Sequence, residues 1–387
     1  MERTQVGIVG AGPAGLFLAY LLDRLGIDTV LIEARSREYI EGRIRAGILE
    51  HGVVQALDEA GVGARMHEIG LPHEGTQFLF NGTIHRIDFQ ELTGKSVMVY
   101  SQHEVVRDLV AARASAGGKM LFEAADVHVE GFQSGSPSIH YKIGGTAQIL
   151  SCDIIAGTDG FHGVCRPSFG PTAFDRIYPF GWLGILAEAP ISTEELVYAN
   201  HDRGFALLSM RSPEVQRLYL QCAPDEDVEA WSDDRIWSEL ATRLQNDRFK
   251  LQTGRIFQKG VTPMRSYVAE PMQAGRLFLA GDAAHIVPPT GAKGMNSAIG
   301  DVLILARALE RWFQRREDSG LETYSATALR RIWKVQRFSW WMTTLFHRFE
   351  AAPPFDRRVQ LAELDYVTGS RAAATALAEN YVGLPLE

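Results

Sequence analysis

Two arginines, a serine and a tyrosine alternate along a strand-like segment in the middle of the chain. Side chains at i and i+2 of a strand share one face, so Ser209 points the same way as Arg211, and Arg217 the same way as Tyr219. If residues 212–216 form a hairpin loop, Arg211 faces Arg217 and Ser209 faces Tyr219. Two facing guanidiniums without a local acid predict a bound anion, for which a carboxylate held by Arg211 in a bidentate pair is the natural candidate. The structural alternative is a solvated sheet edge.

A glycine-rich turn near the N-terminus has the spacing of a dinucleotide-binding loop. Gly10, Gly12 and Gly15 form GxGxxG directly after an apolar strand, and Glu33 follows 18 residues after Gly15. In this fingerprint the first glycine permits the tight turn, the second lets the backbone approach a pyrophosphate, and the third lets helix and strand pack closely. The start of the helix offers free N–H groups and positive charge to phosphates. Glu33 can accept hydrogen bonds from an adenosine ribose.

Two later strand ends favour FAD over a nicotinamide nucleotide as the resident cofactor. Asp159 follows one apolar strand, and Asp282, expected to be buried, follows the strand 277–280. Carboxylates at these strand ends can accept hydrogen bonds from the hydroxyls of a ribityl chain. The next helix begins near Met295 and Asn296, and its N-terminus can direct positive charge at a ring that becomes anionic on reduction.

These motifs together resemble the single-component FAD aromatic hydroxylases. The family's motif set is GAGPAG, then Asp-Gly at 159–160, then GDAAH at 281–285. Longer segments are also similar, among them GDAAHIVPPTGAKG, YANHDRGFAL, RFSWWMT and ENYVGLP. The resemblance runs from about residue 3 to the last few residues.

The resemblance implies an enzyme that takes electrons from NAD(P)H and adds one oxygen atom of O2 to a small aromatic acid. The implied reaction converts 4-hydroxybenzoate into 3,4-dihydroxybenzoate through a flavin C4a-hydroperoxide. A hydroxylase of 4-aminobenzoate or 3-hydroxybenzoate is one alternative. A catalytically idle flavoprotein that senses aromatic acids is another.

The resemblance also implies roles for residues that spacing alone does not single out. Tyr198 and Tyr381 form a hydrogen-bonded pair that takes the substrate's phenol proton, and His73 relays that proton to solvent. The Pro289 carbonyl accepts a hydrogen bond from the phenol. On physical grounds, Arg217 and the tyrosine hydrogen bond are the candidates for stabilising the phenolate. Taken singly, the two tyrosines and His73 fit structural roles better, and only the similar segments around them favour the functional roles.

Around the cofactors, the resemblance implies that Arg45 and Gln102 contact FAD. The residues implied for NAD(P)H are Arg35, Arg37, Tyr39, Arg43, His162 and Arg265. Arg35 and Arg37 can hold the 2′-phosphate of NADPH, whereas Glu38 repels it. NADPH is therefore favoured, and mixed use with NADH stays open.

The composition is that of an ordinary globular protein. Of 387 residues, 46% are hydrophobic, and 39 basic against 47 acidic side chains give a net charge of −8. An acidic chain without a basic tract is a poor nucleic-acid binder. No apolar run is long enough for a membrane helix, and the N-terminus enters a strand without a signal-peptide pattern. The three cysteines match no zinc pattern, so we expect no metal and a cytoplasmic location.

The elements that must hold these residues indicate an α/β fold. Strand, glycine turn, helix and strand form a βαβ unit, and the middle of the chain alternates as in an antiparallel sheet. A stripe beginning at Phe338 and Met342 has helical spacing and fits a buried or dimer-forming helix better than a membrane-surface helix. We expect a homodimer with three regions: a doubly wound FAD-binding domain (1–71, 97–176 and 262–316), an antiparallel substrate domain (72–96 and 177–261) and a helical C-terminal region (317–387).

Overall fold

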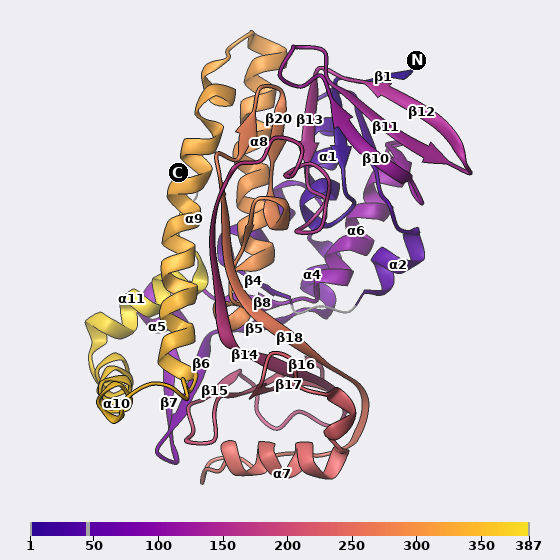
Figure 1. The fold of residues 1–387 in the computed structure, drawn as a ribbon. Helices are drawn as coiled ribbons and strands as arrows, with labels where there is room; N and C mark the ends of the chain where they lie inside the picture. The colour runs from indigo at the N-terminus through magenta and orange to yellow at the C-terminus, as the bar shows by residue number, and fades with distance from the viewer. Residues whose placement is uncertain (1, 44–46, 386–387) are drawn as a thin grey trace.

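The computed structural model describes residues 2–43 and 47–385. Within them the chain forms four sheets, with long helices towards the C-terminus (Figure 1). The predicted α/β fold is confirmed. No helix of this described part is both long and apolar enough to cross a bilayer.

The N-terminal part is built on a parallel sheet with the strand order β19-β20-β13-β2-β3-β9. All neighbours are parallel except β19 and β20, which form a hairpin. In chain order the parallel strands are arranged 3-2-1-4-5, as in doubly wound dinucleotide-binding folds. The bounds are β2 Val6–Val9, β3 Thr29–Ile32, β9 Lys119–Leu121, β13 Ile154–Gly157, β19 Gln273–Ala274 and β20 Leu277–Leu279.

Helices and a second sheet cover this parallel sheet. Helix α1 (Pro13–Arg24) contacts β2 and β3, as well as α6 (Gln102–Ser115) and α8 (Gly294–Arg315). The second sheet has the order β1-β12-β11-β10. Its Ile139 packs on Gly7 of β2, where an added Cβ would lie 2.5 Å from the Ile139 side chain. The strands are β1 Glu2–Arg3, β10 Ala125–Glu130, β11 Ser138–Ile143 and β12 Thr146–Ser151.

The predicted antiparallel sheet in the middle of the chain is also confirmed. It has eight strands in the order β21-β18-β14-β17-β16-β15-β6-β7, and only β15 and β6 are parallel neighbours. Strands β14 and β18 are long and run side by side from the N-terminal part into this sheet (Figure 1). The bounds are β6 Gly75–Phe80, β7 Thr83–Asp88, β14 Thr172–Glu188, β15 Val197–Ala199, β16 Ala206–Ser212, β17 Val215–Cys222, β18 Arg255–Glu270 and β21 His285–Ile286.

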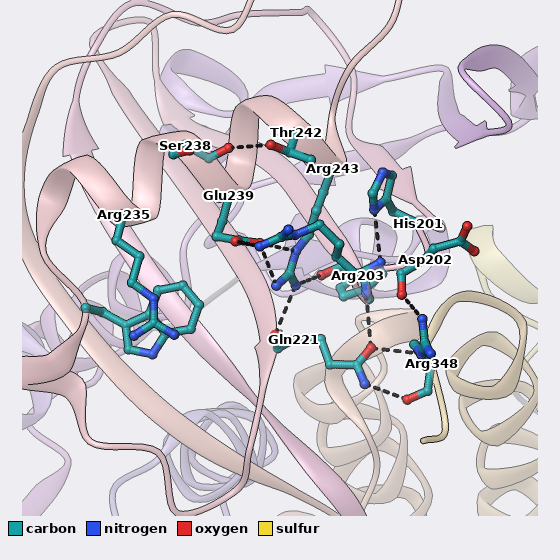
Figure 2. A network of polar contacts seen from close by, with 12 residues as sticks. His201, Asp202, Arg203, Gln221, Arg235, Ser238, Glu239, Thr242, Arg243 and Arg348 are labelled. Atoms are coloured by element: carbon teal, nitrogen blue, oxygen red, sulfur yellow. Dashed lines mark hydrogen bonds and ion pairs between the residues drawn. The ribbon is translucent and has the colours of Figure 1, made fainter. Parts of the chain in front are cut away.

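Helix α7 (Asp233–Arg243) is fixed to this sheet by a buried arginine (Figure 2). Arg243 pairs with Glu239 and donates to the carbonyl oxygens of Phe205 and Gln221 at 3.2 and 3.0 Å. The Gln221 side-chain oxygen accepts from the backbone N–H groups of Phe205 and Arg348, both at 3.0 Å. These contacts hold strand β17 against α7 and against the segment that follows the long C-terminal helix.

The C-terminal helices close the other side of the antiparallel sheet. They are α9 (Ser319–Phe346), α10 (Pro354–Gly369) and α11 (Arg371–Val382). Phe338 and Met342, from the apolar stripe, are buried in one aromatic cluster with Tyr198 and Tyr381. The stripe is therefore part of the core. The remaining strands and α-helices are β4 Ile48–Leu49, β5 Leu71–His73, β8 Val97–Val99, α2 Arg37–Gly42, α3 His51–Glu59, α4 Ala64–Ile69 and α5 Phe89–Thr93.

Candidate active site

The hairpin that carries the two arginines is tighter than the sequence predicted. Ser212 pairs with Val215, so only two residues form the turn, and Ser209 lies opposite Arg217. The predicted loop over 212–216 and the pairing of Arg211 with Arg217 are wrong. The Ser212 hydroxyl accepts from the N–H two residues later and closes the turn, and a bulge between Met210 and Ser212 absorbs Arg211. A bulge of this kind changes the direction of a side chain, so Arg211 can lie near Arg217 and Tyr219 although it is not paired with either.

Both guanidiniums keep unused hydrogen-bond donors. The Nε atoms of Arg211 and Arg217 are buried without a partner, and Arg211 Nη1 donates to the Met210 carbonyl at 2.9 Å. Among the described residues no carboxylate lies within ion-pair distance of either arginine. Burial, reinforced by Arg217, lowers the pKa of Arg211. A bound carboxylate would satisfy these donors and offset the buried charge.

Ser209 and Tyr219 border the same place. The Ser209 hydroxyl donates to the Arg217 carbonyl at 2.7 Å, so in this arrangement only its oxygen lone pairs are free. The Arg217 guanidinium lies 4.9 Å from the centre of the buried Tyr219 ring. The predicted group therefore comes together, although Ser209 faces Arg217 rather than Tyr219.

A buried histidine that the sequence analysis missed supports this wall. The Trp182 ring lies 4.8 Å from Tyr219, and Trp182 Nε1 donates to His347 Nε2 at 2.6 Å. His347 Nδ1 donates to the Thr343 carbonyl at 2.9 Å, which fixes the tautomer. Burial lowers the pKa of His347 to about 3, so the ring is neutral. Nothing in the local sequence links positions 182 and 347, which only the fold brings together.

The two predicted tyrosines meet at the other end of the aromatic cluster. Tyr198 comes from β15 and Tyr381 from α11, and their hydroxyl oxygens are 2.8 Å apart. Both side chains are buried, and burial raises the pKa of each hydroxyl above its ordinary value. Phe89 stacks on Tyr381 at 4.8 Å and fixes its ring. The pair is therefore a neutral hydrogen-bonding couple that can pass on a proton.

His73 and Pro289 lie on separate short elements. His73, on β5, is 2% exposed and its Nδ1 has no hydrogen-bond partner. Burial lowers the pKa of His73 to about 4, so its ring is neutral near pH 7. No hydrogen bond within the described part of the chain joins it to Tyr198 or Tyr381. The Pro289 carbonyl accepts from the Ala292 N–H at 2.9 Å and keeps one lone pair.

The glycine loop has the geometry that a dinucleotide needs. Gly10 has φ +103°, and a Cβ there would lie 2.5 Å from the Thr158 carbonyl oxygen. A Cβ on Gly15 would overlap the Gly10 carbonyl. Above Gly12 there is open space to 4 Å, and this N-cap of α1 makes no side-chain hydrogen bond. The open space and the uncapped N–H groups fit a pyrophosphate.

Glu33 braces this loop from the end of β3. Its two carboxylate oxygens accept from the backbone N–H groups of Ala11 and Arg35, each at 2.7 Å. Each oxygen keeps a lone pair for a further donor such as a ribose hydroxyl.

The two acids predicted at strand ends differ in burial. Asp159 accepts from the Cys165 N–H at 2.9 Å, and its Oδ1 is buried without a partner. Asp282 is exposed, so the prediction that it is buried is wrong. It lies within a 3₁₀ turn whose flanking residues, Gly281 and Ala283, fill the inner side.

The buried acid of this region is Asp301, on α8. Its Oδ2 accepts from the Gly281 N–H at 2.9 Å and lies 2.6 Å from His285 Nε2. The sequence signal that could have indicated this pair was the histidine of GDAAH followed by an acid in the next helix. The pair positions the turn that carries Asp282.

The start of α8 is held by its own side chains. Asn296 accepts from the Glu50 N–H at 2.9 Å and donates to the carbonyls of Ile48 and Ala292 at 2.8 Å. Its side chain therefore fixes the loop before α8. Met295 is partly buried against the N-terminal core, and Gln102 is the first residue of α6.

The residues predicted for NAD(P)H form two separate groups. In the first, the guanidiniums of Arg35 and Arg43 lie 5.4 and 5.9 Å from the ring centre of Tyr39. Arg37 is in an ion pair with Glu41 at 2.6 Å. Three arginines on an exposed surface can attract a phosphate. Arg45, predicted to contact FAD, lies outside the described residues.

The second group surrounds Phe161. The exposed His162 contacts the Phe161 ring edge-on at 5.2 Å, and the Arg265 guanidinium lies 4.6 Å from that ring. Arg265 also pairs with Asp175 through Nε at 2.6 Å. A nucleotide phosphate would have to compete with this carboxylate.

Comparisons with known proteins point in one direction. The family described as FAD binding domain matches residues 3–339. The p-hydroxybenzoate hydroxylase of Acinetobacter baylyi is 49% identical over 390 residues, which is 100% of this chain and 96% of that protein. The 3-(3-hydroxy-phenyl)propionate/3-hydroxycinnamic acid hydroxylase 2 of Burkholderia vietnamiensis is 26% identical over 84% of this chain and 60% of its own length. The fold is similar to that of the p-nitrophenol 4-monooxygenase PnpA of Pseudomonas putida, with a TM-score of 0.82, 18% identity and full coverage of both chains.

Proposed function

The chain belongs to the FAD-dependent aromatic hydroxylases related to p-hydroxybenzoate hydroxylase, and we propose that it hydroxylates 4-hydroxybenzoate to 3,4-dihydroxybenzoate. The electrons come from NAD(P)H, with NADPH the preferred donor, and the oxygen atom comes from O2. The proposal includes a cytoplasmic homodimer.

One observation carries the choice of substrate. Unpaired guanidinium donors lie at one end of an aromatic cluster and a hydroxyl pair at the other. The rings between them are in contact: Tyr219 with Trp182 at 4.8 Å, Trp182 with Phe205 at 5.1 Å, and Phe205 with Tyr198 at 6.2 Å. A molecule with a carboxylate at one end and a phenol at the other matches this sequence of groups.

In this proposal the chain's residues bind and orient the substrate and move one proton. Arg211 holds the carboxylate in a bidentate pair, with Tyr219 and Ser209 beside it. Tyr198 hydrogen-bonds the phenol oxygen and passes its proton to Tyr381. Lowering a phenol pKa from about 10 to about 7.5 requires roughly 3.4 kcal/mol of differential stabilisation. Arg217 and the tyrosine hydroxyl supply it, and the Pro289 carbonyl fixes the phenol.

The residues that would hold FAD are the glycine loop, Glu33, Arg45 and Gln102, with Asp159, Asp282 and the start of α8 at Met295 and Asn296. The buried, unpartnered Asp159 Oδ1 and the open space above Gly12 support this assignment. When bound, FAD supplies the redox and oxygen-activating chemistry, and the chain supplies position and water exclusion. The groups around Tyr39 and Phe161 receive the nicotinamide nucleotide.

The test uses the purified holoenzyme with NADPH or NADH and 4-hydroxybenzoate, 4-aminobenzoate or 3-hydroxybenzoate in turn. We expect 4-hydroxybenzoate to give the largest stimulation of NADPH loss, with an equal amount of 3,4-dihydroxybenzoate formed. Tyr381→Phe should keep substrate binding and lose most product formation, because the proton has no acceptor. Greater stimulation by 4-aminobenzoate would reassign the substrate, and no stimulation by any benzoate would favour an aromatic-acid sensor.

A further inference from the structure

Two histidines and a glutamate converge on the solvent-facing side of the sheet β1-β12-β11-β10. His128 and Glu130 are two residues apart on β10 and share a face, and His140 lies directly opposite His128 on β11. The two imidazole rings stack at 4.7 Å with an angle of 20°. The opposite side of the same strands carries buried Ile139, so the three polar side chains cannot turn inward.

The potential ligand atoms of these side chains are already close to the spacing of a metal site. The Nε2 atoms of His128 and His140 each lie 3.6 Å from a carboxylate oxygen of Glu130. One ligand atom from each residue falls within 4.8 Å of the others. Bonds of about 2.0–2.2 Å to a tetrahedral Zn²⁺ place neighbouring ligand atoms roughly 3.4 Å apart. Small side-chain rotations are enough to close the site.

The surroundings prepare His128 to bind a cation. Its Nδ1 lies 3.2 Å from the Asp126 carbonyl oxygen, which can only accept, so Nδ1 carries the proton and Nε2 keeps its lone pair. Asp126 in turn pairs with Lys142 at 2.8 Å, so this lysine does not occupy Glu130. The competing contact is the Ser138 hydroxyl, 3.1 Å from His140 Nε2, which must rotate away.

We propose that His128, Glu130 and His140 form a surface binding site for one divalent transition-metal ion, with Zn²⁺ the preferred occupant. Two imidazoles and one carboxylate suit Zn²⁺ and its neighbours better than Mg²⁺ or Ca²⁺, which favour oxygen ligands. A water molecule completes the coordination. The ion joins β10 to β11 across the hairpin and therefore stabilises the folded sheet.

This proposal departs from the expectation of no metal, which rested on the spacing of the cysteines. The available signal was a pair of alternating segments, His128-x-Glu130 and His140-x-Lys142, in strands joined by a short connection. Only the register of the hairpin decides that the two histidines face each other.

The test is a calorimetric titration of ZnCl2 into the tag-free, FAD-loaded protein in a buffer that does not bind zinc. We expect one saturable site per chain and a higher melting temperature with Zn²⁺. His128→Ala and His140→Ala should each weaken binding at least tenfold, and Glu130→Gln should weaken it less. All three side chains are at least partly exposed, so the variants should fold.

Two matched variants separate this site from adventitious binding. Ser138→Ala removes the competing hydroxyl and should bind Zn²⁺ at least as tightly as the unchanged chain. His67→Ala removes an exposed histidine that contacts Asp58 at 2.8 Å on another surface and should change nothing. The proposal is overturned if the unchanged chain shows no saturable binding, or if binding survives in both His128→Ala and His140→Ala.

Discussion

Four of the buried side-chain atoms that lack a hydrogen-bond partner lie on residues proposed for substrate binding, cofactor binding or proton transfer. A buried donor or acceptor left unsatisfied costs about 1–3 kcal/mol, and folded proteins keep few of them. Here they include the Nε atoms of Arg211 and Arg217, Oδ1 of Asp159 and Nδ1 of His73. All four belong to residues that the sequence had already singled out for substrate, cofactor or proton transfer. Their lack of partners therefore supports a functional role for each residue.

The bidentate geometry of the Arg211 guanidinium should be essential for substrate affinity. Arg211→Lys keeps the charge but loses the bidentate geometry, which removes about 1.5–3 kcal/mol and weakens 4-hydroxybenzoate binding roughly 10- to 150-fold. The measurement is a titration followed by the flavin absorbance change. Arg255→Lys is the control, because Arg255 forms an exposed ion pair with Glu188 on the same sheet. Equal affinity in Arg211→Lys and the unchanged chain would contradict the assignment.

At the scale of elements, the turn after β2 contains glycines with two different roles. Gly10 and Gly15 shape the fold, whereas Gly12 leaves space for a ligand. Gly10 and Gly15 lie where a side chain meets backbone, whereas nothing occupies the space above Gly12. The same sequence motif therefore contains two kinds of glycine with different consequences when replaced.

The predicted result is a split between stability and cofactor affinity. Gly12→Ala should leave the stability of the FAD-free protein within about 1 kcal/mol of the unchanged chain, yet weaken FAD binding at least about tenfold. Gly10→Ala should lower the melting temperature of the FAD-free protein itself. Thermal unfolding of the FAD-free variants and FAD fluorescence titration measure the two effects. Unchanged FAD affinity in Gly12→Ala would remove the reason for placing the pyrophosphate there.

The segment after α9 should make the protein sensitive to acid. The pKa of His347 is about 3 when folded and 6.5 in its ordinary state, so the unfolded chain binds one more proton between these pH values. Its contribution to stability is complete above pH 6.5 and is lost as the pH falls towards 3. His347→Gln should therefore reduce the slope of the unfolding free energy by up to about 1.4 kcal/mol per pH unit in this window. Urea unfolding at pH 4.5–6.5 measures the slope, and above pH 7 the two slopes should coincide.

At the scale of the whole molecule, the sequence predicted the features that depend on residues close together in the chain. The parallel sheet, the antiparallel sheet and the helical tail follow from hydrophobic periodicity and glycine spacing, and the structure confirms them. The predicted hairpin register was wrong because a bulge at Arg211 has no sequence signature. The predicted burial of Asp282 was wrong because a 3₁₀ turn interrupts the strand pattern. His347 and Asp301 were missed, since their partners Trp182 and His285 come from other elements.

The proposed homodimer has a specific candidate surface on α10. Phe355, Val359 and Tyr366 recur on one side of this helix and are 72%, 51% and 60% exposed. Combining Phe355→Glu with Tyr366→Glu should convert a dimer into monomers in size-exclusion chromatography with light scattering. Ile177→Glu, at a residue 70% exposed on β14, should leave the mass unchanged. A dimer that persists in the α10 variant would place the interface elsewhere.

Strands β14 and β18 also affect how the molecule loses its structure. Their ladder continues from Thr172 opposite Glu270 to Glu188 opposite Arg255, with two irregularities, and so it extends from the N-terminal part through the antiparallel sheet (Figure 1). Unfolding either part alone would break hydrogen bonds of β14 and β18, which also stabilise the other part. Heat should therefore disorder both parts in a single cooperative step, and a fragment cut between them should not keep the structure of either.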